Sequence, residues 1–456
     1  NGKYVTDGDG NVVYASLAEK LFLLCVLKTA ALDPYGMGIE MEGGKPGWYD
    51  ALNGLPGLLG SSMAETYELE RVFDFLIGAV EKYQTGFRVP GELAALAAEL
   101  AQIIEKEKAE WQAEGSNIRC WNAINDQKED YWKKTETGFC AERVLLSKDV
   151  ALQWLKTLRS MVGCGIEKAV ALGKGMAPTY FSYEVTSWEE NDGIQPTGFQ
   201  LREVPAFLEG PVRAMKLHWP AEAKKKLYET VKTSSLYDRK LQMYKVNESL
   251  AGASFELGRA KAFTPGWLEN ESIWLHMEYK YLLELLKNQM YEEYEMDFGH
   301  AAIPFLQEEV YGRSLLENSS FIVSSDNPNP VIHGKGFVAR LSGSTAEFLQ
   351  LWQIMMFGKN PFIWEKDELQ LTFAPMIPKV LIGAEQRVSA RFLSATEVVY
   401  RLPDQETVHP ENSKAAMYSI VWKDGAEERL EVLTGTTAER IRKGEAERIE
   451  VQMERG

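Results

Sequence analysis

Apolar residues recur at helical spacing through most of the first three quarters of the chain. In the clearest case Phe73, Leu76 and Val80 stand three or four residues apart, which predicts a helix with one buried face. Ser62 and Glu65 precede this segment in a capping-box pattern, which predicts where the helix begins. Further helices are predicted over residues 17–32, 92–113, 149–172, 221–232, 272–294 and 344–357.

After residue 360 the pattern changes to alternating and β-branched positions, which are typical of strands. Strands are predicted over residues 369–373, 389–399, 416–422 and 448–453, with an earlier strand over 179–187 and a hairpin of 3–6 and 11–14. We therefore expect a mainly α protein. Residues 1–360 would form a helical barrel or bundle, and residues 361–456 a small C-terminal β-sandwich.

The composition of the chain argues against several kinds of binding partner. The chain has 456 residues, 45% of them hydrophobic, which is enough for more than one domain. A net charge of −16 argues against nucleic acid as a partner, because phosphate backbones are bound through basic patches. No run of about 18 apolar residues predicts a membrane span. The cysteines show no metal-ligand spacing, so we expect no metal site, and free thiols favour a reducing, cytoplasmic compartment. They are Cys25, Cys120, Cys140 and Cys164.

One acid stands in a segment dense in glycine and proline. Asp50 directly follows Trp48 and Tyr49 in the segment KPGWYDALNGLPG. Glycine allows the backbone to turn tightly or to approach a ligand closely, and proline stiffens the loop. Aromatic faces suit a sugar ring, and a carboxylic acid beside them is what glycosidic bond cleavage requires of a general acid. The alternative is a structural turn in which Asp50 caps the backbone.

Two later segments carry further candidates. The segment GKGFVARLSGST places Ser342, Gly343 and Ser344 at the predicted start of a helix, where free N–H groups and the helix dipole attract an anion. An ordinary serine N-cap is the alternative. The segment FTPGWLENESIWLH ends at His276, which taken alone is interpreted as an ordinary helix histidine.

Together the three segments resemble a known family, the inverting disaccharide and oligosaccharide phosphorylases typified by cellobiose and chitobiose phosphorylase. The resemblance is nearest to its large, divergent β-glucan relatives, including β-1,3-glucan phosphorylases. The matching elements, in the same order, are Trp48-Tyr49-Asp50 (Trp-Asn-Asp in the family), Glu269-Asn270 with Ile273 and His276 (Glu-Asn-Gly-Gly-Ile-Phe-x-His), and Leu341-Ser342-Gly343-Ser344 (Leu-Thr-Gly-Thr/Ser). Tyr49 in place of asparagine and Glu271-Ser272 in place of two glycines depart from the family pattern.

The resemblance implies a fold and a set of roles. The fold would be an (α/α)6 barrel, incomplete here, followed by the β-sandwich. In the family a β-sandwich, a linker and the first barrel helices precede the general acid, so we expect a C-terminal fragment that pairs with the missing N-terminal part of the same enzyme. Family members are often dimers, so the resemblance is compatible with a homodimer. The implied site residues are Asp50 as general acid, Trp48, Tyr49, Glu269 and Asn270 at the substrate, and His276, Ser342, Gly343 and Ser344 at the phosphate.

The resemblance thus implies a glycoside phosphorylase. It would cleave a β-glucosidic oligosaccharide with inversion, using inorganic phosphate as co-substrate and no other cofactor, to give α-glucose 1-phosphate. One alternative is an inverting hydrolase with Asp50 as acid and Glu269 as base, with Glu65 and Glu317 as further candidates for the base. The other is a non-catalytic carbohydrate-binding subunit.

Overall fold

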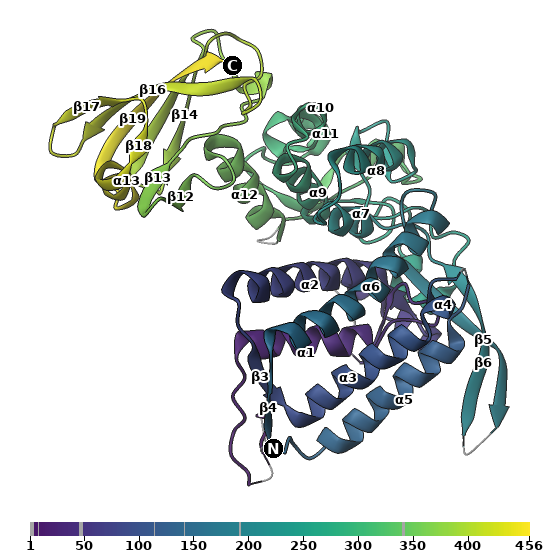
Figure 1. The fold of residues 1–456 in the computed structure, drawn as a ribbon. Helices are drawn as coiled ribbons and strands as arrows, with labels where there is room; N and C mark the ends of the chain where they lie inside the picture. The colour runs from purple at the N-terminus through teal and green to yellow at the C-terminus, as the bar shows by residue number, and fades with distance from the viewer. Residues whose placement is uncertain are drawn as a thin grey trace. The chain divides into compact units, whose positions relative to one another are not determined.

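The structure is a computed structural model that describes residues 4–7, 9–44, 49–113, 115–140, 142–190, 193–339 and 343–456. The chain divides into two compact units, shown in one ribbon in Figure 1. Unit 1 comprises Asn1–Asp238, Tyr244–Ile273 and Val323–Val331, and unit 2 comprises Arg239–Met243, Trp274–Ile322 and Ile332–Gly456. The predicted division into residues 1–360 and 361–456 stays a prediction.

Unit 1 contains a layer of long helices together with several shorter ones. They are α1 (Leu17–Thr29), α2 (Met63–Tyr83), α3 (Gly91–Lys106), α4 (Lys108–Trp111), α5 (Ile118–Thr135), α6 (Lys148–Leu172), α7 (Glu209–Ala214) and α8 (Ala221–Thr233). Helices α1, α2, α3, α5 and α6 lie side by side (Figure 1). Phe73, Leu100 and Leu155 are fully buried between them. The predicted start of α2 is confirmed, because the Ser62 hydroxyl accepts a hydrogen bond from the Glu65 N–H (3.4 Å).

A four-stranded sheet in unit 1 has the order β1-β2-β5-β6. Its strands are β1 (Ile39–Glu40), β2 (Ser61–Ser62), β5 (Tyr180–Glu190) and β6 (Ile194–Glu203). The β5–β6 hairpin extends beyond the helices of its unit in Figure 1, and most of its side chains beyond residue 183 are exposed. Two short ladders pair β3 (Phe87–Pro90) with β4 (Arg143–Leu146) and β7 (Tyr237–Asp238) with β8 (Met243–Tyr244).

Unit 2 combines helices with three sheets. Its helices are α9 (Leu275–Lys287), α10 (Tyr291–Ala301), α11 (Glu308–Tyr311), α12 (Gly343–Phe357) and α13 (Gly435–Arg442). The sheets, in strand order, are β11 (Gly336–Ala339), β10 (Ser319–Ile322) and β9 (Ile273–Trp274); β12 (Phe362–Glu365), β13 (Glu368–Leu371) and β18 (Leu433–Thr434); and β14 (Arg387–Phe392), β15 (Thr396–Arg401), β19 (Ala446–Arg455), β16 (Ser413–Trp422) and β17 (Glu427–Leu430). Helix α9 packs against both α10 and α12.

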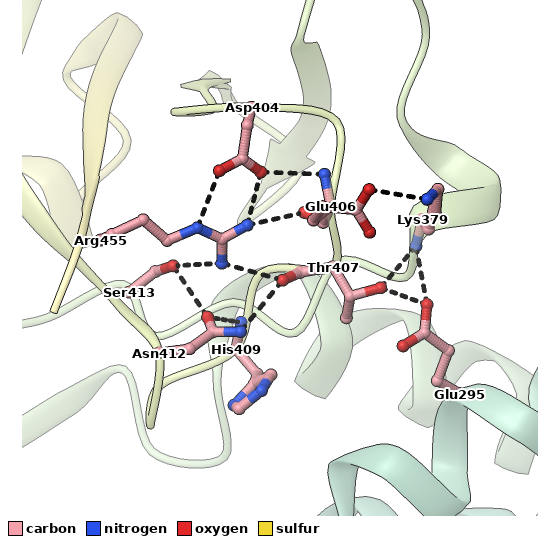
Figure 2. Close-up of polar contacts among 9 residues, drawn as sticks. All are labelled: Glu295, Lys379, Asp404, Glu406, Thr407, His409, Asn412, Ser413 and Arg455. Carbon is pink, nitrogen blue, oxygen red and sulfur yellow. Dashed lines mark hydrogen bonds and ion pairs between the residues drawn. The ribbon is translucent and has the colours of Figure 1, made fainter.

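Polar contacts fasten the C-terminal sheet to the helices of its own unit (Figure 2). Glu295 of α10 accepts hydrogen bonds from the Lys379 N–H (3.2 Å) and from the Thr407 hydroxyl. Arg455 at the end of β19 donates to Asp404 (2.9 Å) and to the Thr407 carbonyl (3.0 Å). The loop between β15 and β16 is therefore held by α10 on one side and by β19 on the other.

The prediction of a mainly α protein, with an (α/α)6-type barrel domain and one small β-sandwich, is wrong. The described chain is mixed, 43% helical and 23% strand, with thirteen α-helices and six separate sheets, one of them five-stranded. Residues 194–203 were not predicted as a strand, because most side chains of β6 are exposed and leave little apolar alternation. The predicted strand 389–399 is two strands, since the chain turns back at Leu393 and Ser394, whose φ values are 51° and 59°.

None of the helices in the described ranges combines the length and the apolar character that crossing a bilayer requires.

Candidate functional site

Asp50 is the first residue of the short 3-10 helix Asp50–Leu52, and its side chain is exposed. The preceding Tyr49 is only 2% exposed, and its ring packs edge-on against Phe207 with centroids 4.9 Å apart. The Tyr49 hydroxyl donates a hydrogen bond to the backbone carbonyl of Glu269. Burial raises the pKa of Tyr49 far above its usual range, so the hydroxyl keeps its proton and remains a donor. Trp48 lies outside the described residues.

Two glycines let the Asp50 loop pack tightly against the segment around residues 254–262. A Cβ on Gly54 would stand 1.9 Å from the Glu256 carbonyl oxygen, and the Gly54 N–H donates to the Leu257 carbonyl (3.1 Å). Gly258 has φ +129°, and a Cβ there would stand 2.6 Å from the Ala51 carbonyl oxygen. Only glycine fits such close backbone approach, so the two loops have a fixed relation to each other.

Glu269 is presented by a tight turn. Trp267 and Asn270 exchange two backbone hydrogen bonds (3.2 and 3.3 Å), and these close the turn around Leu268 and Glu269. Leu268 and Glu271 have φ values of 52° and 56°, in the left-handed region that non-glycine residues seldom occupy. Residues with such strained backbone conformations persist only where neighbouring interactions stabilise them, and they are often found at functional sites.

The charges of Asp50, Glu269 and Arg259 interact within unit 1. The nearest side-chain atoms of Arg259 and Glu269 are 4.0 Å apart, and the Arg259 side chain is 54% exposed. Burial raises the pKa of the Glu269 carboxyl. The Arg259 guanidinium opposes this shift, and the neighbouring charge of Asp50 adds to it. The structure therefore brings together two carboxyl groups that are 219 positions apart in the sequence, with a cation beside one of them.

Asn270 lies behind the same turn and is buried. Its amide nitrogen donates to the Phe263 carbonyl (2.8 Å), whereas its side-chain oxygen has no hydrogen-bond partner among the described residues. Most buried polar atoms in folded proteins are hydrogen-bonded. In the described part of the chain the Asn270 side-chain oxygen is an exception, and it can accept a hydrogen bond from a group that enters the space beside Glu269.

The remaining candidates lie in unit 2. His276 is the second residue of α9, and its Nε2 is 3.7 Å from the Glu347 carboxylate of α12. Lys280, one turn further along α9, has its Nζ 4.0 Å from the same carboxylate oxygen. Gly343 is the first residue of α12 and Ser344 is fully buried in its first turn, whereas Ser342 lies outside the described residues. The structure thus brings His276 to the first turns of α12.

The carboxylate of Glu347 is held in its charged form. Burial by itself would raise the pKa of Glu347, but the nearby His276 imidazole and the charges of Lys280 and Lys287 outweigh burial and lower it. An ionised carboxylate beside an imidazole favours one orientation of the ring, as in many metal and catalytic sites.

Sequence reasoning missed three residues beside the candidates, Lys280 and Glu347 in unit 2 and Arg259 in unit 1. Glu347 follows Ser344 by three positions, which is a capping-box pattern that could have marked it, and Lys280 follows His276 by four, on the same helix face. No sequence signal marks Arg259, because its place beside Glu269 depends on the packing of two loops. Among the described residues no group of three or more acidic, histidine or cysteine side chains could hold a metal ion.

No protein-family model matches the chain, and no curated protein matches it. The function proposed below therefore depends on the residues and their geometry.

Proposed function

We propose that the protein cleaves β-glucosidic oligosaccharides with inorganic phosphate and inverts the anomeric configuration, giving α-glucose 1-phosphate. Asp50 is the general acid, and phosphate is bound by His276 and the start of α12. This proposal is supported by the three sequence elements and by the contacts that Tyr49, Glu269 and His276 make in the structure.

The observation that carries the proposal is the meeting of His276 with α12 inside unit 2. These residues come from two sequence elements that the phosphorylase resemblance assigns to phosphate. The start of a helix offers free N–H groups and the positive end of the helix dipole, and His276 and Lys280 are further donors. The Glu347 carboxylate lies beside both side chains, 3.7 Å from the His276 Nε2 and 4.0 Å from the Lys280 Nζ.

Unit 1 supplies the acid. Asp50 is exposed at the surface of a loop whose backbone is fixed by Tyr49 and Gly54. In the proposed step the Asp50 carboxyl donates its proton to the glycosidic oxygen as the bond from that oxygen to the anomeric carbon breaks. A phosphate oxygen forms the new bond from the opposite face, which accounts for inversion. Phosphate is already a nucleophile, so this step requires no second carboxylate.

A hydrolase is the second candidate, and one observation favours it. Asp50 and Glu269 interact electrostatically, and a pair of carboxyl groups is what an inverting hydrolase uses as acid and base. In that reaction Glu269 would take a proton from the attacking water. Phosphate dependence separates the two reactions.

The decisive test is to incubate the full-length protein with β-gluco-oligosaccharides, with and without phosphate, and to measure glucose 1-phosphate and free glucose. We expect glucose 1-phosphate only with phosphate, and loss of the product in Asp50→Asn. The matched control is Asp9→Asn, at an exposed aspartate of the N-terminal segment, which should retain wild-type rates. Release of glucose at the same rate without phosphate would contradict phosphorolysis.

We also propose that the protein is located in the cytoplasm and that it forms a homodimer. Retention of a sugar phosphate requires a closed compartment, and Cys25, Cys120, Cys140 and Cys164 are free thiols, as a reducing compartment favours. Fractionation of the source cells and light scattering of the purified protein test the two points.

A further inference from the structure

Glu271 stands where the resembling family has glycine, and its backbone keeps the conformation that glycine would adopt easily. Its φ of 56° lies in the left-handed region, where a side chain is strained. Glu271 comes directly after Asn270, which closes the turn that presents Glu269. Some interaction of the glutamate side chain must therefore outweigh the strain in its backbone.

That interaction is a buried cluster of charges behind the turn. The Nζ of Lys245 is 3.7 Å from the Glu271 carboxylate and also donates to Asp326. Lys245 and Glu271 are 4% and 5% exposed, whereas the Asp326 side chain is 41% exposed. Burial raises the pKa of Glu271, the Lys245 ammonium opposes this, and Asp326 adds to it. A buried ammonium requires a charged partner, and Glu271 is the buried one of the two carboxylates beside Lys245.

The cluster is connected to the candidate site through the backbone of the turn. The Glu271 N–H donates to the Asn247 side-chain oxygen (2.8 Å), which fixes the exit of the turn. At the entrance, the Ser324 N–H donates to the Gly266 carbonyl (3.4 Å). Between these two anchors the Glu269 carbonyl accepts the hydrogen bond of Tyr49. A displacement of the turn would therefore move both Glu269 and the residue that precedes Asp50.

We propose that the buried Lys245–Glu271 ion pair positions the Glu269 turn against the Asp50 loop, and that Lys245 and Glu271 are positioning residues for cleavage of the glycosidic bond. The inference deepens the proposed function and rests on it for its kinetic consequence. Neither residue touches the substrate. Lys245 forms an ion pair with Glu271, which directly follows the turn. The turn also accepts the hydrogen bond of the Tyr49 hydroxyl through the Glu269 carbonyl.

The competing interpretation is that the Lys245–Glu271 pair only stabilises the fold. Glu271→Gly distinguishes this structural role from the positioning role. Glycine removes the ion pair with Lys245 but fits the positive φ without strain, so the gain from relieved strain offsets part of the lost attraction. Lys245 keeps Asp326 as a partner in this variant and is not left buried and unpaired. The fold should therefore survive while the turn gains freedom.

The experiment compares Glu271→Gly with Asp367→Gly in the full-length protein. Asp367 also has a positive φ, 62°, but lies in the turn between β12 and β13, so it is a matched control for the glycine effect alone. We expect Glu271→Gly to lower kcat about tenfold with little change in KM, because a misplacement of 1 Å can lower a rate roughly 100-fold. Asp367→Gly should retain the wild-type kcat. Equal kcat values for Glu271→Gly and the wild type would overturn the proposal.

A second measurement needs no substrate and stands independently of the reaction. Amide hydrogen exchange at Asn270 and Glu271, whose N–H groups are hydrogen-bonded, should accelerate in Glu271→Gly and in Lys245→Met, and not in Asp367→Gly. Unchanged exchange in both variants refutes the positioning role. Absence of phosphate-dependent cleavage by the wild type refutes the proposed function and leaves the exchange result intact, so the two failures are distinguishable.

Discussion

Tyr49→Phe tests whether one hydroxyl ties the Asp50 loop to the Glu269 turn. The substitution keeps the ring, its edge contact with Phe207 and nearly all its buried surface. It removes the hydrogen bond that the hydroxyl donates to the Glu269 carbonyl. Because the ring is 2% exposed, water cannot easily replace the lost donor, and the carbonyl is left without that partner. An unsatisfied buried acceptor costs about 1–3 kcal/mol, so we expect a loss near 2 kcal/mol in the free energy of unfolding.

Urea unfolding measures this loss through the midpoint, provided that the m value is unchanged. Tyr67→Phe, at an equally buried tyrosine of α2 in the same unit, is the matched control. Steady-state kinetics should show a lower kcat for Tyr49→Phe, since the backbone next to Asp50 loses its anchor. A stability loss below about 0.5 kcal/mol, the usual range for neutral substitutions, together with wild-type kcat would show that the hydroxyl ties nothing together.

Three further predictions follow from close approach and from shifted pKa values. Gly54→Ala places a Cβ 1.9 Å from the Glu256 carbonyl oxygen and should lower stability to urea by roughly 3 kcal/mol, as overpacking does, whereas Gly57→Ala, with nothing within 4 Å, should not. Burial lowers the pKa of His409 below 6.5, so the unfolded state binds more protons and stability should fall as pH decreases below about 6.5. His409→Gln should remove that part of the pH dependence of the urea midpoint. The pKa of Glu347 is lowered in the folded protein, since the nearby His276 imidazole and the charges of Lys280 and Lys287 outweigh burial. The ionised carboxylate therefore contributes its full stabilisation above pH 4.5, and this contribution is lost as the pH falls below that value. Glu347→Gln should weaken the pH dependence of the urea midpoint below pH 4.5 and leave it unchanged above that pH.

The long helices were predictable because each buries a continuous face. The spacing of Phe73, Leu76 and Val80 predicts α2, and the structure confirms both the helix and its cap at Ser62. Helix α5 was missed, since its sequence is strongly polar and only a few of its side chains, among them Ile124 and Tyr131, are buried. Apolar periodicity reports burial, so an element that buries little leaves little signal.

The sequence predicted individual residues of the candidate site, but it did not predict which of them lie close together. Asp50, Glu269 and His276 were named from their segments, but no pattern shows that Asp50 lies near Glu269. That neighbourhood depends on Gly54 and Gly258, which let two backbones approach closely. Such long-range contacts depend on glycines whose role becomes visible only when the opposing segment is known.

The raised pKa of Glu269 bears on the choice between phosphorolysis and hydrolysis. A hydrolytic base must be ionised to take a proton from water. Burial raises the pKa of the Glu269 carboxyl, the Arg259 guanidinium opposes this shift and the charge of Asp50 adds to it, and the net upward direction does not favour such a base. Glu269→Gln replaces the carboxyl with a neutral side chain of nearly the same shape. Under phosphorolysis we expect a loss of less than about tenfold in the rate of glucose 1-phosphate formation, whereas removal of a general base lowers a rate about 10²–10⁴-fold. Glu256→Gln, at an exposed glutamate of the adjoining segment, is the control. A loss above about 100-fold in Glu269→Gln alone would assign proton transfer to Glu269 and contradict a mechanism in which Asp50 is the sole acid–base group.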